Sequence, residues 1–193
     1  MLKHLIFGFS LTAAAAFGGA TSVLAQSNDG STMSAEEMED IFSKQKTRGL
    51  VLAPTNQQST VAAEAEPDTP VESNTTYVEL APEEQVNIQI SFDFDSSALR
   101  EDQKPKLATL CTVIKNVDIG VFRIIGHTDT SGSASYNERL SLLRAQEVKR
   151  FLVGDCGIEE TRLDAVGVGE QFPIDKENPS GDVNRRVEFQ AMT

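Results

Sequence analysis

The sequence predicts an α+β fold, a two-layer sandwich in which a mixed four-stranded β-sheet carries two long helices packed on one face. The first observation is the alternation of apolar and polar residues in VNIQISFDF (86–94), which is typical of a half-buried strand. The second is that two stretches with apolar residues at helical spacing lie between shorter apolar runs. Strands separated by helices need crossover connections, which favour helices on one face of a mixed sheet.

The expected elements follow one another from residue 86 onward. Apolar residues at helical spacing over 107–114 predict a helix, with Pro105 tolerated in its first turn. The longest helix is expected from Tyr136 to about Val153, where Gly154 and Gly157 end it. Three further strands are predicted at 121–125, 163–168 and 186–192.

The first 25 residues have the features of a signal peptide. Lys3 and His4 give a basic start, an apolar run covers 5–19, and Val23, Leu24 and Ala25 supply residues suited to a cleavage site. The apolar run is shorter than the about 20 residues that span a bilayer. We therefore expect cleavage after Ala25 and a mature chain without a transmembrane segment.

Residues 26–81 are expected to form an acidic, largely disordered linker that precedes a domain over 82–193. The stretch 52–76 is polar, contains proline and has few large apolar side chains that could offset the entropy of ordering. A short helix is predicted near 34–45, where a capping box precedes apolar residues at helical spacing, and a short strand at 50–53. We expect this segment to dock on the domain. The alternative is that it binds an envelope protein while the linker acts as a tether and is dispensable for ligand binding.

Charge and cysteine content narrow the function classes. The formal net charge is −12 at pH 7, so the chain lacks the basic surface that nucleic-acid binding requires. Cys111 and Cys156 would be in a compartment where disulfides persist. The sequence leaves both a bridge and two free thiols open, because it does not show how close the two Cα atoms come.

The stretch GHTDTSGSASYNERLSLLRA (126–145) combines the residue types of a binding site. Asp129 follows an apolar strand, whereas Asn137, Leu140 and Arg144 lie on one stripe of the long helix. Helical side chains lean toward the N-terminus, and Arg144 is only about 10 Å along the axis from Asn137. The arginine is therefore long enough to reach toward the loop that holds Asp129.

An acid and an arginine beside the start of a helix suit a zwitterionic ligand. The arginine would bind a carboxylate through two parallel hydrogen bonds, and Asp129 would bind an ammonium group. The alternative is a structural salt bridge between Asp129 and Arg144 that ties the loop to the helix. Spacing alone favours the salt bridge.

Five segments together resemble the OmpA C-terminal-like family of peptidoglycan-binding domains, of the OmpA, MotB and Pal type. They are FDFDSSAL (92–99), GHTDTSG (126–132), YNERLSLLRA (136–145), VGVGE (166–170) and NRRVEF (184–189). All five occur in the family's order and span roughly 90–190. The resemblance implies the same mixed sheet with two long helices on one face.

The resemblance also implies a ligand and a set of residues. The ligand is peptidoglycan, bound non-covalently through the diaminopimelate of the stem peptide, whose side chain ends in an α-amino acid head. Asp129 is expected to hold the ammonium and Arg144 the carboxylate. The other expected peptidoglycan-binding residues are Asn137, Leu140, Thr130, Asp95 and Arg185. The mature protein is then expected in the periplasm, with or without association with the outer membrane, where it contributes to envelope integrity.

Two other functions are alternatives to peptidoglycan binding. The first is an envelope protein-interaction module that does not bind the wall. The second is a metal-dependent hydrolase built on His127, Asp129 and Asp95. The chain has two histidines, of which His4 would leave with the signal peptide, and it has no HExxH pair. We therefore expect no enzyme activity, no metal and no cofactor.

Overall fold

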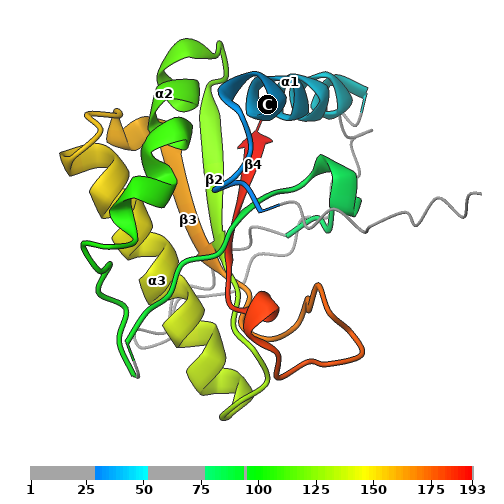
Figure 1. Ribbon diagram of the computed structural model, residues 1–193. Coiled ribbons are helices and arrows are strands. Elements are labelled where there is room, and N and C mark those ends of the chain that lie inside the picture. The colour runs from blue at the N-terminus through cyan, green and yellow to red at the C-terminus, as the bar shows by residue number, and fades with distance from the viewer. Residues whose placement is uncertain (1–28, 52–76, 94, 193) are drawn as a thin grey trace, which may run out of the picture.

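A mixed four-stranded sheet forms the centre of the computed structural model, which describes residues 29–51, 77–93 and 95–192 (Figure 1). The strand order is β1-β4-β2-β3. The strands are β1 (Val86–Ile88), β2 (Val121–Gly126), β3 (Leu163–Gly167) and β4 (Val187–Met192). β2 and β3 are parallel, whereas β4 runs antiparallel to both β1 and β2. The predicted α+β class and mixed sheet are confirmed.

Three helices pack on one face of this sheet, one more than the two long helices predicted. They are α1 (Ala35–Val51), α2 (Ala108–Asn116) and α3 (Ala134–Gly154), and a short 3-10 helix, Lys104–Leu107, leads into α2. In Figure 1, α2 and α3 lie along the sheet, whereas α1 crosses its upper end beside β4. The third helix is the segment that the sequence assigned to the linker.

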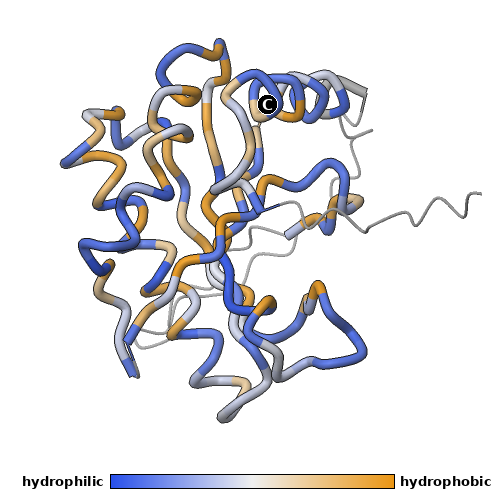
Figure 2. Tube along the Cα trace, in the orientation of Figure 1, coloured by the Kyte–Doolittle hydropathy of each residue, from blue (hydrophilic) through white to orange (hydrophobic). Residues whose placement is uncertain are grey.

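The alternation along the strands separates an apolar face from a polar face. The apolar face of β2 and β4 carries Phe122, Ile124, Val187 and Phe189, which are all buried in the core under the helices. Neighbouring strand positions carry polar residues on the opposite face, among them Glu188. Figure 2 shows the hydrophobic residues gathered along the strands, whereas the long loop before β4 is mostly hydrophilic. The period-two pattern therefore decides which face the helices cover.

Two glycines let α3 approach the backbone of β2 and β3. A Cβ atom on Gly126 would lie 2.1 Å from the carbonyl oxygen of Ser141, and one on Gly167 would lie 2.3 Å from the backbone nitrogen of Leu142. No real Cβ atom tolerates such distances, so larger residues would push the helix away. The Ser141 hydroxyl also accepts a hydrogen bond from the Gly169 N–H at 2.9 Å. The first half of α3 is thereby fixed against the ends of the two central strands.

The first strand is shorter than predicted. β1 ends at Ile88, and the chain from there to the 3-10 helix has no regular structure in the residues described. Ile88 pairs with Val187, which is the first residue of β4, so the residues after Ile88 have no neighbouring strand to pair with. Phe94, expected on the apolar side of this strand, lies outside the described residues.

Helix α1 begins as predicted but ends later. The capping box is present: the Ser34 N–H donates to the Glu37 carboxylate at 2.8 Å, and the Glu37 N–H donates to the Ser34 hydroxyl at 3.2 Å. The helix continues to Val51, so residues 50 and 51 are helical, whereas a strand was expected there. The expected signal peptide and the stretch 52–76 lie outside the described residues.

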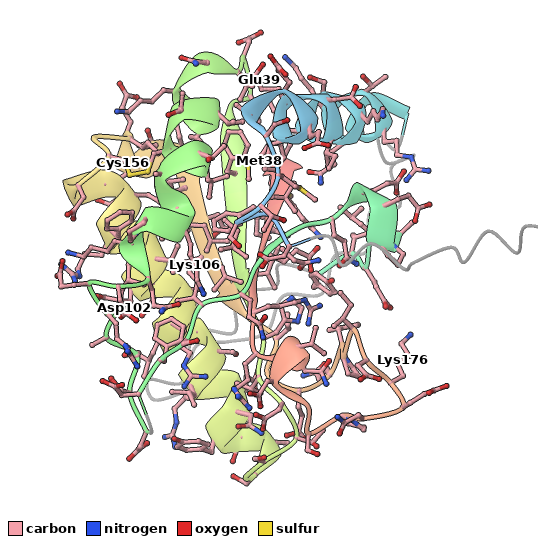
Figure 3. The ribbon with its side chains drawn as sticks, in the orientation of Figure 1. Met38, Glu39, Asp102, Lys106, Cys156 and Lys176 are labelled. Carbon is pink, nitrogen blue, oxygen red and sulfur yellow. A yellow bond between two sulfur atoms is a disulfide. The ribbon has the colours of Figure 1, made fainter. Side chains whose placement is uncertain are left out.

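The apolar side of α1 is part of the domain core. Met38 and Phe42 are fully buried, and the Phe42 ring packs edge-on against Phe122 with centroids 5.0 Å apart. Figure 3 shows Met38 on the sheet side of α1 and Glu39 on the opposite side. Docking on the domain is therefore what the structure shows. The alternative, in which Met38 and Phe42 bind a partner at the end of a tether, does not fit their burial.

A disulfide joins α2 to the turn that follows α3. Cys111 and Cys156 are bonded, with their Cα atoms 5.8 Å apart, which answers the question that the sequence left open. The bridge lies where the two helices run side by side (Figure 3). Within the described ranges, no helix is long and apolar enough to cross a bilayer.

Removing the α1 anchor should destabilise the whole domain. We expect Phe42→Ala to lower the free energy of unfolding by about 3–5 kcal/mol, because it leaves a cavity in the core. The matched control is Ser43→Ala, on the exposed side of the same helix, which should change stability by less than about 0.5 kcal/mol. Urea denaturation measures both. Equal midpoints for Phe42→Ala and the wild type would show that α1 is not part of the folded domain, and a chain beginning at Tyr77 would then be as stable.

Removing the disulfide should also cost stability. The two cysteines are 45 positions apart, for which the chain-entropy model gives a stabilisation of about 4 kcal/mol at most. We expect the double substitution Cys111→Ser and Cys156→Ser to lower the denaturation midpoint, and reductant to lower that of the wild type alone. A wild-type midpoint that does not respond to reductant would contradict the bridge.

Candidate functional site

A cavity of about 440 Å3 lies beside the N-terminal half of α3. Four segments line it: the chain after β1, the loop after β2, the start of α3 and the residues before β4. The sequence-predicted residues that line it are Asp95, Asp129, Asn137, Leu140, Arg144 and Arg185. The structure thus brings together six of the seven residues predicted for the site.

Sheet topology explains why these segments meet. Gly126 at the end of β2 pairs with Val187 at the start of β4, so the loop after β2 lies next to the residues that precede β4. The His127 N–H continues the ladder by donating to the Arg186 carbonyl at 3.0 Å. Asp129 and Arg185 therefore meet at one edge of the sheet, although 56 positions separate them in the sequence.

Asp129 is held by two donors. Its carboxylate accepts a hydrogen bond from the Arg185 guanidinium at 2.6 Å and another from the Ser131 N–H at 2.8 Å. The side chain is mostly buried, and burial by itself would raise the pKa of Asp129. The bonds from Arg185 and Ser131 outweigh burial and hold this pKa below its usual value. Asp129 is therefore an anion at neutral pH.

Arg144 has a different environment. Its guanidinium stacks over the Phe92 ring at 4.7 Å from the centroid, and its Nε–H donates to the Ser96 carbonyl at 3.2 Å. The residue is only 8% exposed, and burial lowers its pKa, with the positive charge of Arg185 acting in the same direction. Within the described part of the chain, Arg144 forms no ion pair with a carboxylate.

The salt bridge between Asp129 and Arg144 that spacing favoured is absent from the site. Asp129 pairs with Arg185 instead, because the pairing of β4 with β2 brings Arg185 directly to the loop after β2. Helical spacing shows only which residues share a face of α3. It carries no information on a partner supplied by the residues just before β4, far along the sequence.

Asn137 and Leu140 support the site rather than carry charge. The Asn137 amide donates to the Asp129 carbonyl at 3.2 Å and also to the Glu170 carboxylate, so it ties the loop after β2 to α3. Leu140 adds an apolar wall to the cavity. Their spacing on α3 made both predictable.

Thr130, the seventh residue predicted for the site, is not among the residues that line the cavity. It is exposed, and its N–H donates to the Pro179 carbonyl at 3.2 Å. Thr128 lines the cavity instead, and its buried hydroxyl has no hydrogen-bond partner among the residues described.

Two aromatic residues of the site were missed. Phe92 lies under Arg144, and Tyr136 donates its hydroxyl hydrogen to Asp95 at 2.5 Å. Asp95 holds a positive φ of 52°, which is uncommon outside glycine. Phe92 lies in the segment FDFDSSAL and Tyr136 in YNERLSLLRA. Their place in the segments that resemble the family could have predicted that they belong to the site.

His127 belongs to the far face of the sheet rather than to the cavity. Its Nε2 lies 3.1 Å from the Glu188 carboxylate, which also accepts hydrogen bonds from Tyr77 and Gln190. Burial lowers the pKa of His127 to about 4, despite the opposing effect of Glu188, so the ring is neutral at pH 7.

The hydrolase alternative needs His127 beside Asp129 and Asp95. The two aspartates line the cavity, whereas His127 does not, and no group of three metal-binding side chains occurs in the described residues.

Comparison with known proteins adds the family. Residues 91–186, which include every residue lining the cavity from Ser91 to Arg185, match the family model described as OmpA family. The domain belongs to the OmpA family.

Several relatives of this OmpA-family domain are outer-membrane proteins by name. Outer membrane porin F of Pseudomonas aeruginosa is 37% identical over 106 residues, covering 54% of this chain and 30% of that protein. Outer membrane protein A of Bordetella avium is 33% identical over 108 residues, covering 55% of each chain. The match therefore spans less than two thirds of each relative's own length.

Solved structures were also similar. The peptidoglycan-associated lipoprotein from Burkholderia pseudomallei is 28% identical, with a TM-score of 0.44 over 52% of this chain and 86% of that chain. The cell wall anchor of the T6SS from Pseudomonas aeruginosa is 27% identical, with a TM-score of 0.47 over 56% of this chain and 80% of that chain.

Acid should destabilise the OmpA-family domain through His127. The unfolded chain takes up a proton at this residue near pH 6.5, whereas the folded chain does so near pH 4. The unfolded state therefore binds more protons between these values. As the pH is lowered through this range, the free energy of unfolding decreases by up to about 1.4 kcal/mol per pH unit. His127→Gln keeps a donor for Glu188 without this titration, so it should flatten the slope of unfolding free energy between pH 6.5 and 4.5. A slope equal to that of the wild type would show that His127 is not the group responsible.

Proposed function

We propose that the domain binds peptidoglycan non-covalently, through the α-amino acid head of diaminopimelate in the stem peptide. Membership of the OmpA family and the outer-membrane relatives support a peptidoglycan-associated role in the cell envelope. The family is one of binding modules, and the domain is not an enzyme. The finer proposal, the identity of the bound group, rests on the cavity.

The observation that carries the proposal is a buried arginine without a carboxylate partner, close to an ionised aspartate. Burying a guanidinium without a counter-charge is unfavourable unless a ligand supplies the charge. Arg144 still has its terminal N–H groups, which match the two oxygens of a carboxylate. A ligand that brings a carboxylate to this point would balance the charge.

Asp129 supplies the complementary half of the site. Each oxygen of an ionised carboxylate can accept more than one hydrogen bond, so the bonds from Arg185 and Ser131 leave acceptor capacity for an ammonium group. Arg185 and Ser131 also keep Asp129 ionised and fix its orientation. A ligand that carries an ammonium and a carboxylate on one carbon would engage Asp129 and Arg144 together.

The remaining parts of the proposal concern location and partners. The relatives fit a periplasmic protein associated with the outer membrane, with the first 25 residues acting as a signal peptide. The alternative of a protein-interaction module without wall binding relied on the N-terminal segment. The burial of Met38 and Phe42 removes the residues that favoured it.

Charge removal in the cavity should abolish wall binding. We expect Asp129→Ala and Arg144→Ala each to weaken binding to diaminopimelate-type peptidoglycan by about 2–5 kcal/mol, since each leaves a buried charge of the complex unpaired. Arg139→Ala is the matched control, because Arg139 is an exposed arginine on the same helix and does not line the cavity. Co-sedimentation with purified sacculi measures binding, and thermal melts confirm that each variant is folded. Sedimentation equal to the wild type by either cavity variant would refute the assignment.

A further inference from the structure

The carboxylates that line the cavity have side-chain partners, whereas one of the lining arginines has no ion pair in the described residues. Asp93 pairs with Arg100 at 3.2 Å, Asp95 accepts the Tyr136 hydroxyl, and Asp129 and Asp182 both pair with Arg185, at 2.6 and 2.5 Å. Every lining carboxylate therefore accepts a hydrogen bond from another side chain, and Asp129 and Asp182 share the same arginine. Arg144 is the lining cation that forms an ion pair with none of them in the described part of the chain, although the charge of Asp129 acts on it through space.

The position of Arg144 makes this imbalance costly. The Phe92 ring covers one face of the guanidinium, and the Ser96 carbonyl takes its Nε–H. Neither neighbour carries a negative charge. A guanidinium stays protonated even when burial opposes it, so the charge cannot be relieved by losing a proton.

We infer that the site reads the charge state of the ligand's free carboxyl group and rejects diaminopimelate in which that group is amidated. The inference rests on the proposed function and adds a specificity to it. An ionised carboxylate offers the Arg144 fork two acceptor oxygens and a full negative charge. A carboxamide offers one acceptor, no charge, and an NH2 group that turns a donor toward the N–H groups of the guanidinium.

The size of the discrimination follows from the cost of an unmatched buried charge. Losing one partner of a buried, hydrogen-bonded charge pair typically weakens binding by about 30-fold or more. Arg185 does not compensate, because its guanidinium is already paired with both Asp129 and Asp182. The ammonium end of the ligand is the same in both forms, so the difference between them reports on Arg144.

The test compares two ligands on the full chain by isothermal titration calorimetry. The ligands are a muropeptide that ends in meso-diaminopimelate and the same muropeptide in which the carboxyl of the α-amino acid head, at the end of the diaminopimelate side chain, is converted to a carboxamide. We expect the wild type to bind the ionised form about 30-fold or more tightly than the amidated form. Arg144→Gln should bind the ionised form weakly and lose the preference, whereas Arg144→Lys should keep part of it because its charge remains. Arg139→Gln should behave like the wild type.

The outcomes separate the inference from the proposed function. Equal wild-type affinities for the two muropeptides would overturn the inference and leave diaminopimelate binding in place. No binding of either muropeptide would overturn both. A full preference retained by Arg144→Gln would show that another residue reads the carboxyl group. The wild-type comparison needs no variant, so a folding defect in Arg144→Gln would not remove the test.

Discussion

The site depends on the close approach of α3 to the ends of β2 and β3. Gly126 and Gly167 have no side chains, and the backbone of α3 at Ser141 and Leu142 occupies the space where their Cβ atoms would be. This contact fixes the height and rotation of the helix over the sheet. Arg144, less than one turn beyond Ser141, is therefore held at a set position relative to the loop that continues from β2. A larger residue at either glycine would move the arginine away from Asp129 without touching the cavity.

The two arginines that line the cavity have different surroundings because of this geometry. Arg185 lies just before β4 and keeps Asp129 ionised. Arg144 lies on α3, where it contacts the Phe92 ring and the Ser96 carbonyl. Arg185 is paired within the protein, whereas Arg144 forms no ion pair in the described residues, which is why we propose it as the group that binds the ligand's carboxylate. Under the proposed function, such a cavity would favour a zwitterion over a simple cation or anion.

The elements within the domain could be predicted from the sequence because their patterns are local. The long helix, the central strands and the stripe of Asn137, Leu140 and Arg144 follow from spacing alone, and the family resemblance supplied the ligand class. Three features depend on long-range contacts that spacing does not carry. They are the end of β1, which is set by where β4 begins, the pairing of Asp129 with Arg185, and the burial of α1. The apolar residues of α1 predicted a helix, but only its contact with Phe122 shows that they complete the core.

The central claim is that Arg144, and not Arg185, receives the carboxylate of the ligand. A crystal structure of the protein with meso-diaminopimelate tests it most directly. We predict carboxylate oxygens within about 2.7–2.9 Å of the Arg144 guanidinium nitrogens, with the ammonium against Asp129 and the bond between Asp129 and Arg185 intact. A ligand whose carboxylate displaces Asp129 from Arg185, with Arg144 left in contact only with Phe92 and Ser96, would contradict it.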